Sequence, residues 1–594
     1  MAPFEKVLVA NRGEIAVRVF RTLRELGIRA VGVYSEADRG SLHVALADEA
    51  YLLGPGPPAE SYLHVERVLA AAAKSGAEAV HPGYGFLAEN ASFARAVEEA
   101  GLVWIGPPPE AIEAMGSKVT ARRLMQDAGV PVIPGTTDPV VAVEAVLALG
   151  EEHGWPLAIK AAAGGGGKGL KVVRSPEEAE RALASARREG EAYFADATVY
   201  VERFLEDPRH VEVQVLADAH GNVVHLGERD CTIQRRHQKL VEETPSPAVG
   251  PELRERIGRI AVEAARAVGY RGAGTIEGLL DRDGSYFFLE MNTRIQVEHP
   301  VTELVTGVDL VREQVLVAAG EPLSFGQEDV RFSGHAIECR INAEDAAAGF
   351  LPSPGTITAY REPAGPGVRV DSGVTEGSEV VGIYDPLVAK LVVWDADRER
   401  ARRRMLRALR EYEIGGVATL LGFHRALLGH PCFAAGETCF GLVEQIAAAD
   451  GDAQATTARG AAVPARGREE VVAVELDGRR FDVTLLRPEP PHAELARRRR
   501  ERVGDGGHRA AAREAVVSPM QGTVLAVEVA EGEEVREGQV ICVVEAMKME
   551  NELTAHRHGR ITGLSVAPGE PVTTGQVICV VAQEGDDAAG APAE

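Results

Sequence analysis

Polar side chains with the makings of a metal and phosphate site lie in one short segment, between Phe288 and Pro300. Every second position there is polar: Glu290, Asn292, Arg294, Gln296 and Glu298. An extended chain would place all five on one face. A solvated strand face has the same pattern, but it does not explain the further carboxylate Glu277, about one hairpin earlier. Hard oxygen ligands from two adjacent strands suit Mg²⁺ that bridges nucleotide phosphates.

Lysine is scarce, and its positions are therefore informative. Of the 64 basic residues only nine are lysines, and a guanidinium cannot replace a compact or reactive amine. Lys6, Lys74 and Lys171 are interpreted as ordinary surface residues. The other six are candidates for chemistry: Lys118, Lys160, Lys168, Lys239, Lys390 and Lys548.

A glycine run, Gly164–Gly167, lies between Lys160 and Lys168. Glycines allow backbone N–H groups to approach phosphate oxygens, and the flanking lysines add charge. Such a run is as often a flexible lid. It lacks the order of residues of a P-loop, so a phosphate site here requires another nucleotide-binding fold.

The C-terminal part contains an internal repeat. Residues 522–546 align with residues 559–583 at an offset of 37, with 13 identities in 25 positions. Two copies of one β unit are expected to pack as a sandwich, because neither can bury its valines and isoleucines alone. Lys548 lies in the segment that joins the copies, between Met547 and Met549. We expect it at the tip of an exposed turn, where an ordinary surface lysine is the alternative.

The elements that must position these residues begin with a βαβ unit. Val7–Ala10 is a predicted buried strand, Ile15 to Leu26 has helical spacing, and Ala30–Tyr34 is the next strand. The intervening turn, Asn11–Glu14, lacks the GxGxxG pattern, which disfavours a nicotinamide enzyme. Mixed strand and helix patterns continue to about Ile446.

Less regular sequence follows. Residues 448–468 are predicted to be a linker, and Val471–Leu486 a hairpin around Asp477-Gly478. Residues 487–513 are predicted to be disordered, as is the tail from Gly585. The arginine run Arg497–Arg500 is interpreted as solvated linker rather than a nucleic-acid patch.

Composition excludes several classes of protein. The chain has 594 residues and a net charge of 64 − 89 = −25, so nucleic acid and anionic membranes are poor partners. Hydrophobic residues make up 45% and charged residues 26%, as in soluble globular chains. The six cysteines form no CxxC pair, which argues against a disulfide framework and a zinc ribbon. With no signal-peptide or membrane-length apolar run, we expect a cytoplasmic protein.

Two motif sets resemble known families. Ala546–Met549 reads Ala-Met-Lys-Met and resembles the biotin carboxyl carrier domain, so Lys548 would carry biotin attached by a separate biotin protein ligase. Lipoyl domains share that fold but flank their lysine differently. The segments 235–239, 288–300 and 338–345 resemble biotin carboxylase. The resemblance covers residues 4–446 and 515–583.

The resemblance implies a role for each site residue. ATP would bind an ATP-grasp fold through Lys118, Lys160, Gly166, Gly167, Glu202, Leu205, His210, His237, Glu277 and Glu290. Mg²⁺ or Mn²⁺ would bind Glu277, Glu290 and Asn292. Bicarbonate would bind Lys239, Arg294, Gln296 and Val297. The catalytic residues would be Lys239, Arg294, Glu298 as the base, and Arg340 as the stabiliser of the biotin enolate. The chain departs from the family at Ala163, in the glycine run, and at Gly278.

The implied fold is α/β and multidomain. It comprises a pre-ATP-grasp α/β domain at 1–117, an ATP-grasp domain at 118–330 and a biotin carboxylase C-terminal domain at 331–446. A linker with a small hairpin at 447–514 precedes an all-β biotinyl domain, a flattened barrel or sandwich, at 515–583. Residues 584–594 form a disordered tail.

The implied reaction is the ATP-dependent carboxylation of biotin by bicarbonate, through carboxyphosphate. Only 68 residues separate Ile446 from Ala515, too few for a carboxyltransferase barrel of about 250 residues. We therefore expect a carboxyltransferase β subunit in trans, in an oligomeric holoenzyme that carboxylates acetyl-CoA or propionyl-CoA. Another ATP-grasp ligase with a fused carrier, and a biotinylated scaffold with a decayed nucleotide site, are the alternatives.

Overall fold

The computed structural model describes residues 2–136, 139–161, 170–194, 198–236, 238–448, 467–476, 479–488, 515–546, 549–573 and 575–582. The chain divides into two compact units. The first comprises residues 1–346, 353–381 and 386–447, and the second comprises residues 347–352, 382–385 and 448–594. The predicted site residues other than Lys548 belong to the first unit.

The chain begins with a parallel sheet. Its five strands are, in spatial order, β3 (Glu49–Gly54), β2 (Arg29–Ser35), β1 (Lys6–Val9), β4 (Ala79–His81) and β5 (Val103–Trp104). Helix α1 (Gly13–Glu25) joins β1 to β2 and buries Ile15, Val19 and Leu23, as the helical spacing predicts. The predicted βαβ unit is therefore confirmed. Helices α2 (Leu42–Leu46), α3 (Val65–Ser75) and α4 (Ala91–Glu99) complete this part.

An eight-stranded antiparallel sheet is the largest element of the first unit. Its order is β13 (Tyr286–Asn292), β12 (Gly272–Leu280), β9 (Arg209–Ala217), β10 (Val223–Arg235), β11 (Gln238–Thr244), β14 (His335–Asn342), β21 (Leu387–Asp395) and β19 (Val368–Ser372). Because β11 pairs with β14, the sheet is continuous across residue 330, so the predicted ATP-grasp and C-terminal domains share it.

Helices and short strands surround this sheet. The helices are α5 (Pro109–Gly116), α6 (Lys118–Asp127), α9 (Pro251–Ala267), α10 (His299–Thr306), α11 (Leu310–Ala318), α12 (Arg398–Glu411), α13 (Leu421–Gly429) and α14 (Pro431–Ala435). Short strands include β15 (Glu344–Asp345), β17 (Gly355–Thr356), β18 (Ala359–Arg361), β20 (Glu379–Val380) and β22 (Glu413–Gly415). Helix α9 packs on β9 and β10 through Ile257, Ala261 and Ala264, which share one face.

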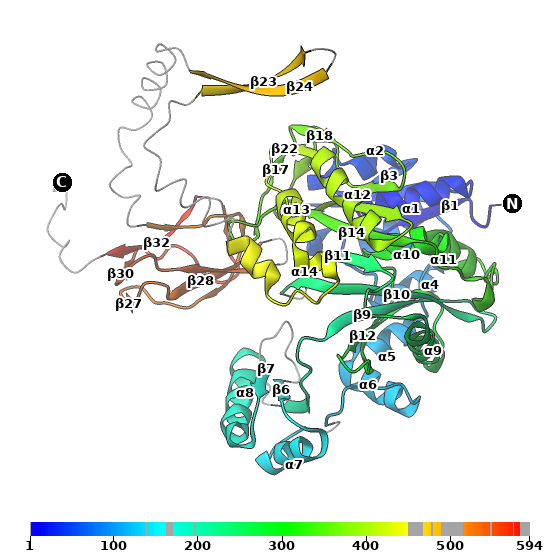
Figure 1. The fold of residues 1–594 in the computed structure, drawn as a ribbon, viewed down its shortest axis with the longest axis horizontal. Helices are drawn as coiled ribbons and strands as arrows, with labels where there is room; N and C mark the ends of the chain where they lie inside the picture. Colours follow the sequence, from blue (N-terminus) through cyan, green and yellow to red (C-terminus); the bar gives the residue numbers. More distant parts are fainter. Residues whose placement is uncertain are drawn as a thin grey trace. The chain divides into compact units, whose positions relative to one another are not determined.

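A smaller three-stranded sheet orders β7 (Leu170–Val173), β6 (Leu157–Ala161) and β8 (Val199–Arg203). Helices α7 (Val143–His153) and α8 (Ala179–Phe194) lie beside it in Figure 1 and share its apolar core. The register places Ala158 opposite Glu202. The glycine run falls between β6 and β7, outside the described residues.

The condition of an extended chain from Glu290 to Glu298 holds only as far as Asn292. Strand β13 ends at Asn292; the chain then bends at Thr293 and turns before α10 begins at His299. Pro300 in the first turn of α10 favours a helix start at that point, because its fixed φ suits a helix and its missing N–H costs nothing there. A bent segment, not one strand face, therefore presents the last three of these polar side chains.

The second unit contains two predicted β elements. Strands β23 (Gly467–Leu476) and β24 (Arg479–Pro488) form the predicted hairpin, with each strand longer than expected, so residues 467–468 of the predicted linker and residues 487–488 of the predicted disordered stretch belong to strands. Residues 449–466 and 489–513, and the tail, lie outside the described residues. Strand β16 (Leu351–Pro352) also belongs to this unit.

The repeat forms the predicted sandwich. One sheet orders β25 (Ala515–Val517), β32 (Val577–Ala582), β30 (Gly559–Thr562) and β27 (Glu534–Val535); the other orders β29 (Met549–Thr554), β28 (Val540–Ala546), β26 (Gly522–Val527) and β31 (Pro571–Val572). Val544 and Val581, which are equivalent in the two copies, share one apolar core. A side chain at Gly522 would meet the Glu545 carbonyl, and one at Gly559 the equivalent Ala582 carbonyl, so both copies need glycine.

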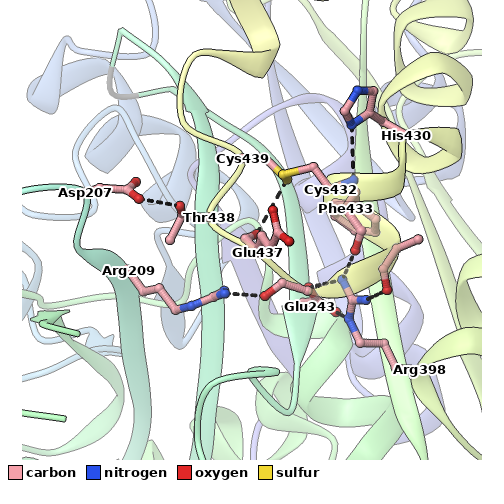
Figure 2. The surroundings of a disulfide bond; sticks show 12 residues. Asp207, Arg209, Glu243, Arg398, His430, Cys432, Phe433, Glu437, Thr438 and Cys439 are labelled. Carbon is pink, nitrogen blue, oxygen red and sulfur yellow. Dashed lines mark hydrogen bonds and ion pairs between the residues drawn. A yellow bond between two sulfur atoms is a disulfide. The ribbon is translucent and has the colours of Figure 1, made fainter. Parts of the chain in front are cut away.

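A disulfide joins Cys432 and Cys439 in the first unit (Figure 2). The cysteine spacing indicated no disulfide framework, and this single bond is one that the CxxC criterion could not find, because its partners are seven positions apart. Helix α14 turns the chain back, and Gly436 ends it in the left-handed conformation, which brings the two thiols together. The other four cysteines are free and buried.

Candidate active site

Thirteen of the predicted site residues line one cavity of about 1250 Å³ in the first unit. They are Lys160, Glu202, Leu205, His210, Lys239, Glu277, Glu290, Asn292, Arg294, Gln296, Val297, Glu298 and Arg340. The remaining predictions are not placed: Gly166, Gly167, His237 and Lys548 lie outside the described residues, and of Lys118 only its position at the start of α6 is described. Distant parts of the chain thus meet around a space suited to a nucleotide and a small anion.

Strand register explains how the carboxylates converge. Glu290 pairs with Glu277, Glu277 with Glu212, and Glu212 with Arg229, across β13, β12, β9 and β10. Directly opposed residues in antiparallel strands project from the same face. The sheet therefore presents a row of three carboxylates and one arginine. Glu212 and Arg229 were not predicted, because their signal is pairing between strands that are remote in sequence.

Lys239 is the centre of the charge cluster. Its Nζ lies 2.5 Å from Glu212 Oε2, 2.9 Å from Glu277 Oε1 and 2.8 Å from Glu298 Oε1. Burial by itself would lower the pKa of Lys239, but the nearby carboxylates outweigh it and hold that pKa well above its usual range. Lys239 is thus a fixed positive charge inside the cavity.

Glu298 lies between two cations. Its Oε2 accepts a hydrogen bond of 2.9 Å from Arg340, whose Nε donates at 2.5 Å to Glu242. Burial would raise the pKa of Glu298, but Lys239, Arg340 and Arg229 hold it well below its usual range. Glu298 is therefore ionised at neutral pH and able to accept a proton. Glu242 is a further residue that the sequence reasoning missed.

Arg229 supports the floor of the cavity. It is fully buried, and it donates to Glu212 at 2.6 Å and to Gln214 at 2.7 Å, and also to Gln296. Gln296 in turn donates to Glu277 Oε1 at 2.7 Å. The one sequence signal for Arg229 is that it is a charged residue within a strand whose residues are mostly buried. An arginine so placed must be hydrogen-bonded throughout, which fixes the side chains that it contacts.

Arg294 and Lys390 hold the segment that follows β13. Arg294 Nε pairs with Glu89 at 2.8 Å, a residue the sequence did not identify. Lys390, a candidate without an assigned role, is fully buried; its Nζ donates to the Val297 carbonyl at 3.0 Å and lies 3.1 Å from Glu14 Oε2. Lys390 thus acts on the backbone beside Glu298 and does not itself line the cavity.

Three of the predicted nucleotide residues, Lys160, Glu202 and His210, lie on β6, β8 and β9. Lys160 pairs with Glu202 across β6 and β8. His210 Nε2 lies 2.7 Å from Glu277 Oε2, and its Nδ1 lies 2.9 Å from Gln234 Nε2. Burial lowers the pKa of His210, but Glu277 more than offsets this and raises it. His210 therefore connects the expected nucleotide residues to the expected metal ligands.

The donor set of Glu277, Glu290 and Asn292 fits a divalent cation. Glu277 and Glu290 are cross-strand neighbours, and Asn292 Nδ2 lies 2.7 Å from Glu277 Oε1. Burial opposes ionisation of Glu277, but Lys239 and His210 hold its pKa well below the usual range. Two carboxylates and an amide oxygen are hard ligands of the kind Mg²⁺ takes while keeping phosphate oxygens and waters.

Gly278, the departure beside Glu277, has a packing explanation. A Cβ at this position would lie 2.3 Å from the ring of Tyr286, on the paired strand. The buried tyrosine thus fills the place of a side chain at 278, and the β-bulge between Glu277 and Gly278 accommodates it. Ala163, the other departure, lies outside the described residues.

In the second unit, the strands on either side of Lys548 are paired up to Ala546 and Met549.

The first unit has a nucleotide-sized cavity beside a three-stranded and an eight-stranded sheet, and the second unit has a two-sheet sandwich. Together these features define the class: an ATP-grasp ligase with a carrier domain. Family models agree along the chain. They are "Biotin carboxylase, N-terminal domain" at residues 3–112, "Carbamoyl-phosphate synthase L chain, ATP binding domain" at 117–325, "Biotin carboxylase C-terminal domain" at 338–445 and "Biotin-requiring enzyme" at 514–581. The chain belongs to the biotin carboxylase family, in the group that joins these domains to a biotinyl domain.

Relatives of several substrate classes match the chain. The biotin-dependent acyl-coenzyme A carboxylase alpha3 subunit of Mycobacterium leprae is 48% identical over 93% of this chain and 94% of its own length. A pyruvate carboxylase subunit of Methanothermobacter thermautotrophicus is 55% identical over 73% of this chain and 88% of its own length. Among solved structures, biotin carboxylase from Campylobacter jejuni in complex with β-γ-ATP is 45% identical, with a TM-score of 0.69, over 74% of this chain and 98% of its own.

Another solved structure is the biotin carboxylase domain of 2-oxoglutarate carboxylase from Hydrogenobacter thermophilus in complex with MgADP and bicarbonate. It is 48% identical, with a TM-score of 0.69, over 75% of this chain and 98% of its own.

The chain is therefore an ATP-grasp ligase with biotin carboxylase activity, and it uses biotin, ATP and Mg²⁺. In the described part of the chain, every helix is too short or too polar to cross a membrane.

Proposed function

We propose that this chain is the α subunit of a biotin-dependent acyl-CoA carboxylase. It carboxylates biotin on its own Lys548, and a carboxyltransferase on another polypeptide uses the product to carboxylate acetyl-CoA or propionyl-CoA. The observation that carries the carboxylation step is the contact of Lys239, which lines the cavity, with Glu212, Glu277 and Glu298. The acyl-CoA class is supported by the relative that matches this chain over 93% of its length.

The residues suit the problem of bringing anions together. Lys239 and Arg294 offset the charge of bicarbonate, and Gln296 and Val297 orient it in the cavity that all four line. Mg²⁺, when bound by Glu277, Glu290 and Asn292, neutralises charge on the ATP phosphates. The ATP side is assigned to Lys118, Lys160, Gly166, Gly167, Glu202, Leu205, His210 and His237.

Glu298 is the proposed base. Lys239 and Arg340 hold the pKa of Glu298 well below its usual range against the effect of burial. An anion that binds Lys239 competes with Glu298 for the ammonium charge, so its arrival raises the pKa of Glu298 towards the ordinary value. Glu298 thus becomes a better base when bicarbonate is present, which couples proton removal to substrate binding.

Arg340 is proposed to stabilise negative charge on the biotin ring. Biotin, when attached, supplies a ureido nitrogen that accepts carbon dioxide. Arg340 lines the cavity, and its pKa is raised by Glu242 and Glu298 despite burial, so the guanidinium remains charged. Its neighbour on the paired strand, Lys390, holds the backbone of the 296–299 turn.

A two-stage assay tests this function. The biotinylated chain should hydrolyse ATP only with bicarbonate, and bicarbonate-independent hydrolysis would refute the carboxylation step. The holoenzyme purified from its native cell should then transfer labelled bicarbonate to acetyl-CoA or propionyl-CoA. The Lys548→Arg variant, which keeps the charge but offers no biotin attachment site, should incorporate no label.

A 2-oxo acid acceptor is the second candidate, because the pyruvate carboxylase relative is 55% identical over the biotin carboxylase part of this chain. Pyruvate and 2-oxoglutarate therefore belong in the same assay. Label transfer to either one, and to neither acyl-CoA, would replace the acyl-CoA assignment and leave the carboxylation step intact.

A further inference from the structure

One wall of the cavity that holds the expected nucleotide residues includes Cys439, one half of the disulfide. Thr438, Cys439, Phe440, Gly441, Val443 and Glu444 line the cavity. We call residues 436–441 the rim segment. Cys439 is buried within it, whereas Phe440 is 83% exposed, so the ring beside the disulfide is held by little other packing.

The rim segment is bonded to the chain between two expected nucleotide residues, Leu205 and His210. Thr438 Oγ1 donates to Asp207 Oδ2 at 2.7 Å (Figure 2). Arg209 donates to the Gly436 carbonyl. Movement of the rim segment would therefore move Asp207 and Arg209, which lie between Leu205 and His210 in the chain.

The other half of the disulfide is attached to a rigid support. Arg398 donates to the Phe433 carbonyl at 2.8 Å and pairs with Glu243 at 2.7 Å (Figure 2). His430 Nδ1 accepts the backbone N–H of Cys432 at 3.2 Å. Cys432 is thus fixed to α14 and, through Arg398, to β11. The disulfide ties the cavity-facing Cys439 to this support.

We propose that Cys432 and Cys439 are a reversible redox modification site, and that their disulfide positions the rim segment for nucleotide binding. This inference rests on the proposed function for the identity of the ligand. Oxidised chain binds nucleotide with the rim segment already ordered. Reduced chain must order that segment on binding, at a cost in conformational entropy that lowers affinity.

The chemistry is thiol–disulfide exchange with a small-molecule disulfide as oxidant. The Cys432 thiolate is the more accessible of the two; it attacks the small disulfide and releases one thiolate. The Cys439 thiolate then attacks the mixed disulfide, forms the Cys432–Cys439 bond and releases the second thiolate. Two protein thiols are oxidised, one small disulfide is reduced to two thiols, and a dithiol reverses the exchange.

Two measurements on the full chain test the proposal. Thiols are first trapped by alkylation during non-reducing purification, and peptide mass spectrometry should find Cys432 and Cys439 linked and unalkylated. MgADP binding is then measured by calorimetry before and after treatment with dithiothreitol. The hydrogen bonds of Thr438 and of the Gly436 carbonyl keep most of the rim segment in place, so reduction leaves about one residue, Cys439, to be ordered on binding. We therefore expect reduction to raise the Kd about five- to thirtyfold.

The double variant Cys432→Ala/Cys439→Ala should have the Kd of the reduced chain and should not respond to dithiothreitol. Reduction of the unmodified chain needs no substitution, so the test stands even where the variant folds poorly. A Kd that is the same in both redox states, or two alkylated cysteines, would overturn the proposal.

The two proposals fail in different ways. Because MgADP binding requires neither bicarbonate nor biotin, a redox-insensitive Kd leaves the carboxylase function in place. ATP hydrolysis without bicarbonate refutes that function but leaves the redox effect on binding measurable. Absence of MgADP binding in both redox states would overturn both.

Discussion

Glu298→Gln is the most direct test of the proposed chemistry. The substitution keeps the shape of the side chain but removes the group that accepts a proton. In the structure Glu298 Oε1 lies 2.8 Å from Lys239 Nζ, and its Oε2 lies 2.9 Å from Arg340. Both cations keep other carboxylate partners, Glu277 for Lys239 and Glu242 for Arg340. The variant is therefore expected to fold.

The magnitude follows from the loss of general-base catalysis. A positioned base contributes about 10²- to 10⁴-fold, which corresponds to about 3–5 kcal/mol in the activation barrier. We expect kcat for bicarbonate-dependent ATP hydrolysis to fall by that factor. MgATP binding should stay within about threefold, because the partners of Glu298 are Lys239 and Arg340 and not the residues assigned to ATP, such as Lys160 and Glu202.

The assay compares steady-state ATP hydrolysis with and without bicarbonate, and MgATP binding by calorimetry. Glu228→Gln is a matched control: Glu228 is also a fully buried carboxylate paired with an arginine, Arg254 at 2.8 Å, and it does not line the cavity. The base assignment is refuted if Glu298→Gln retains kcat within tenfold of the unmodified chain. It is also refuted if Glu228→Gln loses as much kcat as Glu298→Gln.

Three further predictions concern stability, followed by tryptophan fluorescence in urea, since all three tryptophans belong to the first unit. Lys390→Met leaves Glu14 buried without its ammonium partner and should lower the free energy of unfolding by about 3–5 kcal/mol; equal stability would contradict the buried ion pair. Gly278→Ala places a methyl group against the Tyr286 ring and should cost about 1–3 kcal/mol; a double-mutant cycle should show a smaller cost for Gly278→Ala in the Tyr286→Leu background, and an equal cost would contradict the contact. Burial lowers the pKa of His81 to about 4, and its Nδ1 accepts a backbone N–H at 3.0 Å. The folded chain therefore holds His81 neutral, whereas the unfolded chain protonates it below about pH 6.5. The free energy of unfolding should fall by up to about 1.4 kcal/mol per pH unit as the pH is lowered from 6.5 to 4, and His81→Gln should reduce that slope.

Local signals in the sequence were sufficient for much of the fold. The βαβ start depends on a buried strand and a helix with 3.6-residue spacing, and α1 follows that spacing. The hairpin at Asp477-Gly478 and the repeat that builds the sandwich are also local or periodic patterns. The patterns of α1 and of the repeat survive because each of these elements buries its own apolar face.

Residues 290–298 are extended only as far as Asn292, which the alternation could not indicate. Polar residues alternate in the same way in a strand and in a segment that bends. In the bent segment, each polar side chain contacts a different partner. Arg294 turns to Glu89 and Glu298 to Arg340, partners contributed by remote parts of the chain. Periodicity could not identify those partners.

The sequence by itself indicated which residues we propose for the chemistry, because rare lysines, alternating polar residues and two family-like motifs are local and chemically specific signals. Only the tertiary structure decided how those charges are balanced. Glu212 and Arg229 lie between the predicted residues, and Lys390 holds the backbone beside Glu298. A buried charge is tolerable only next to its partner, and partners drawn from separate strands become neighbours only when the sheet forms.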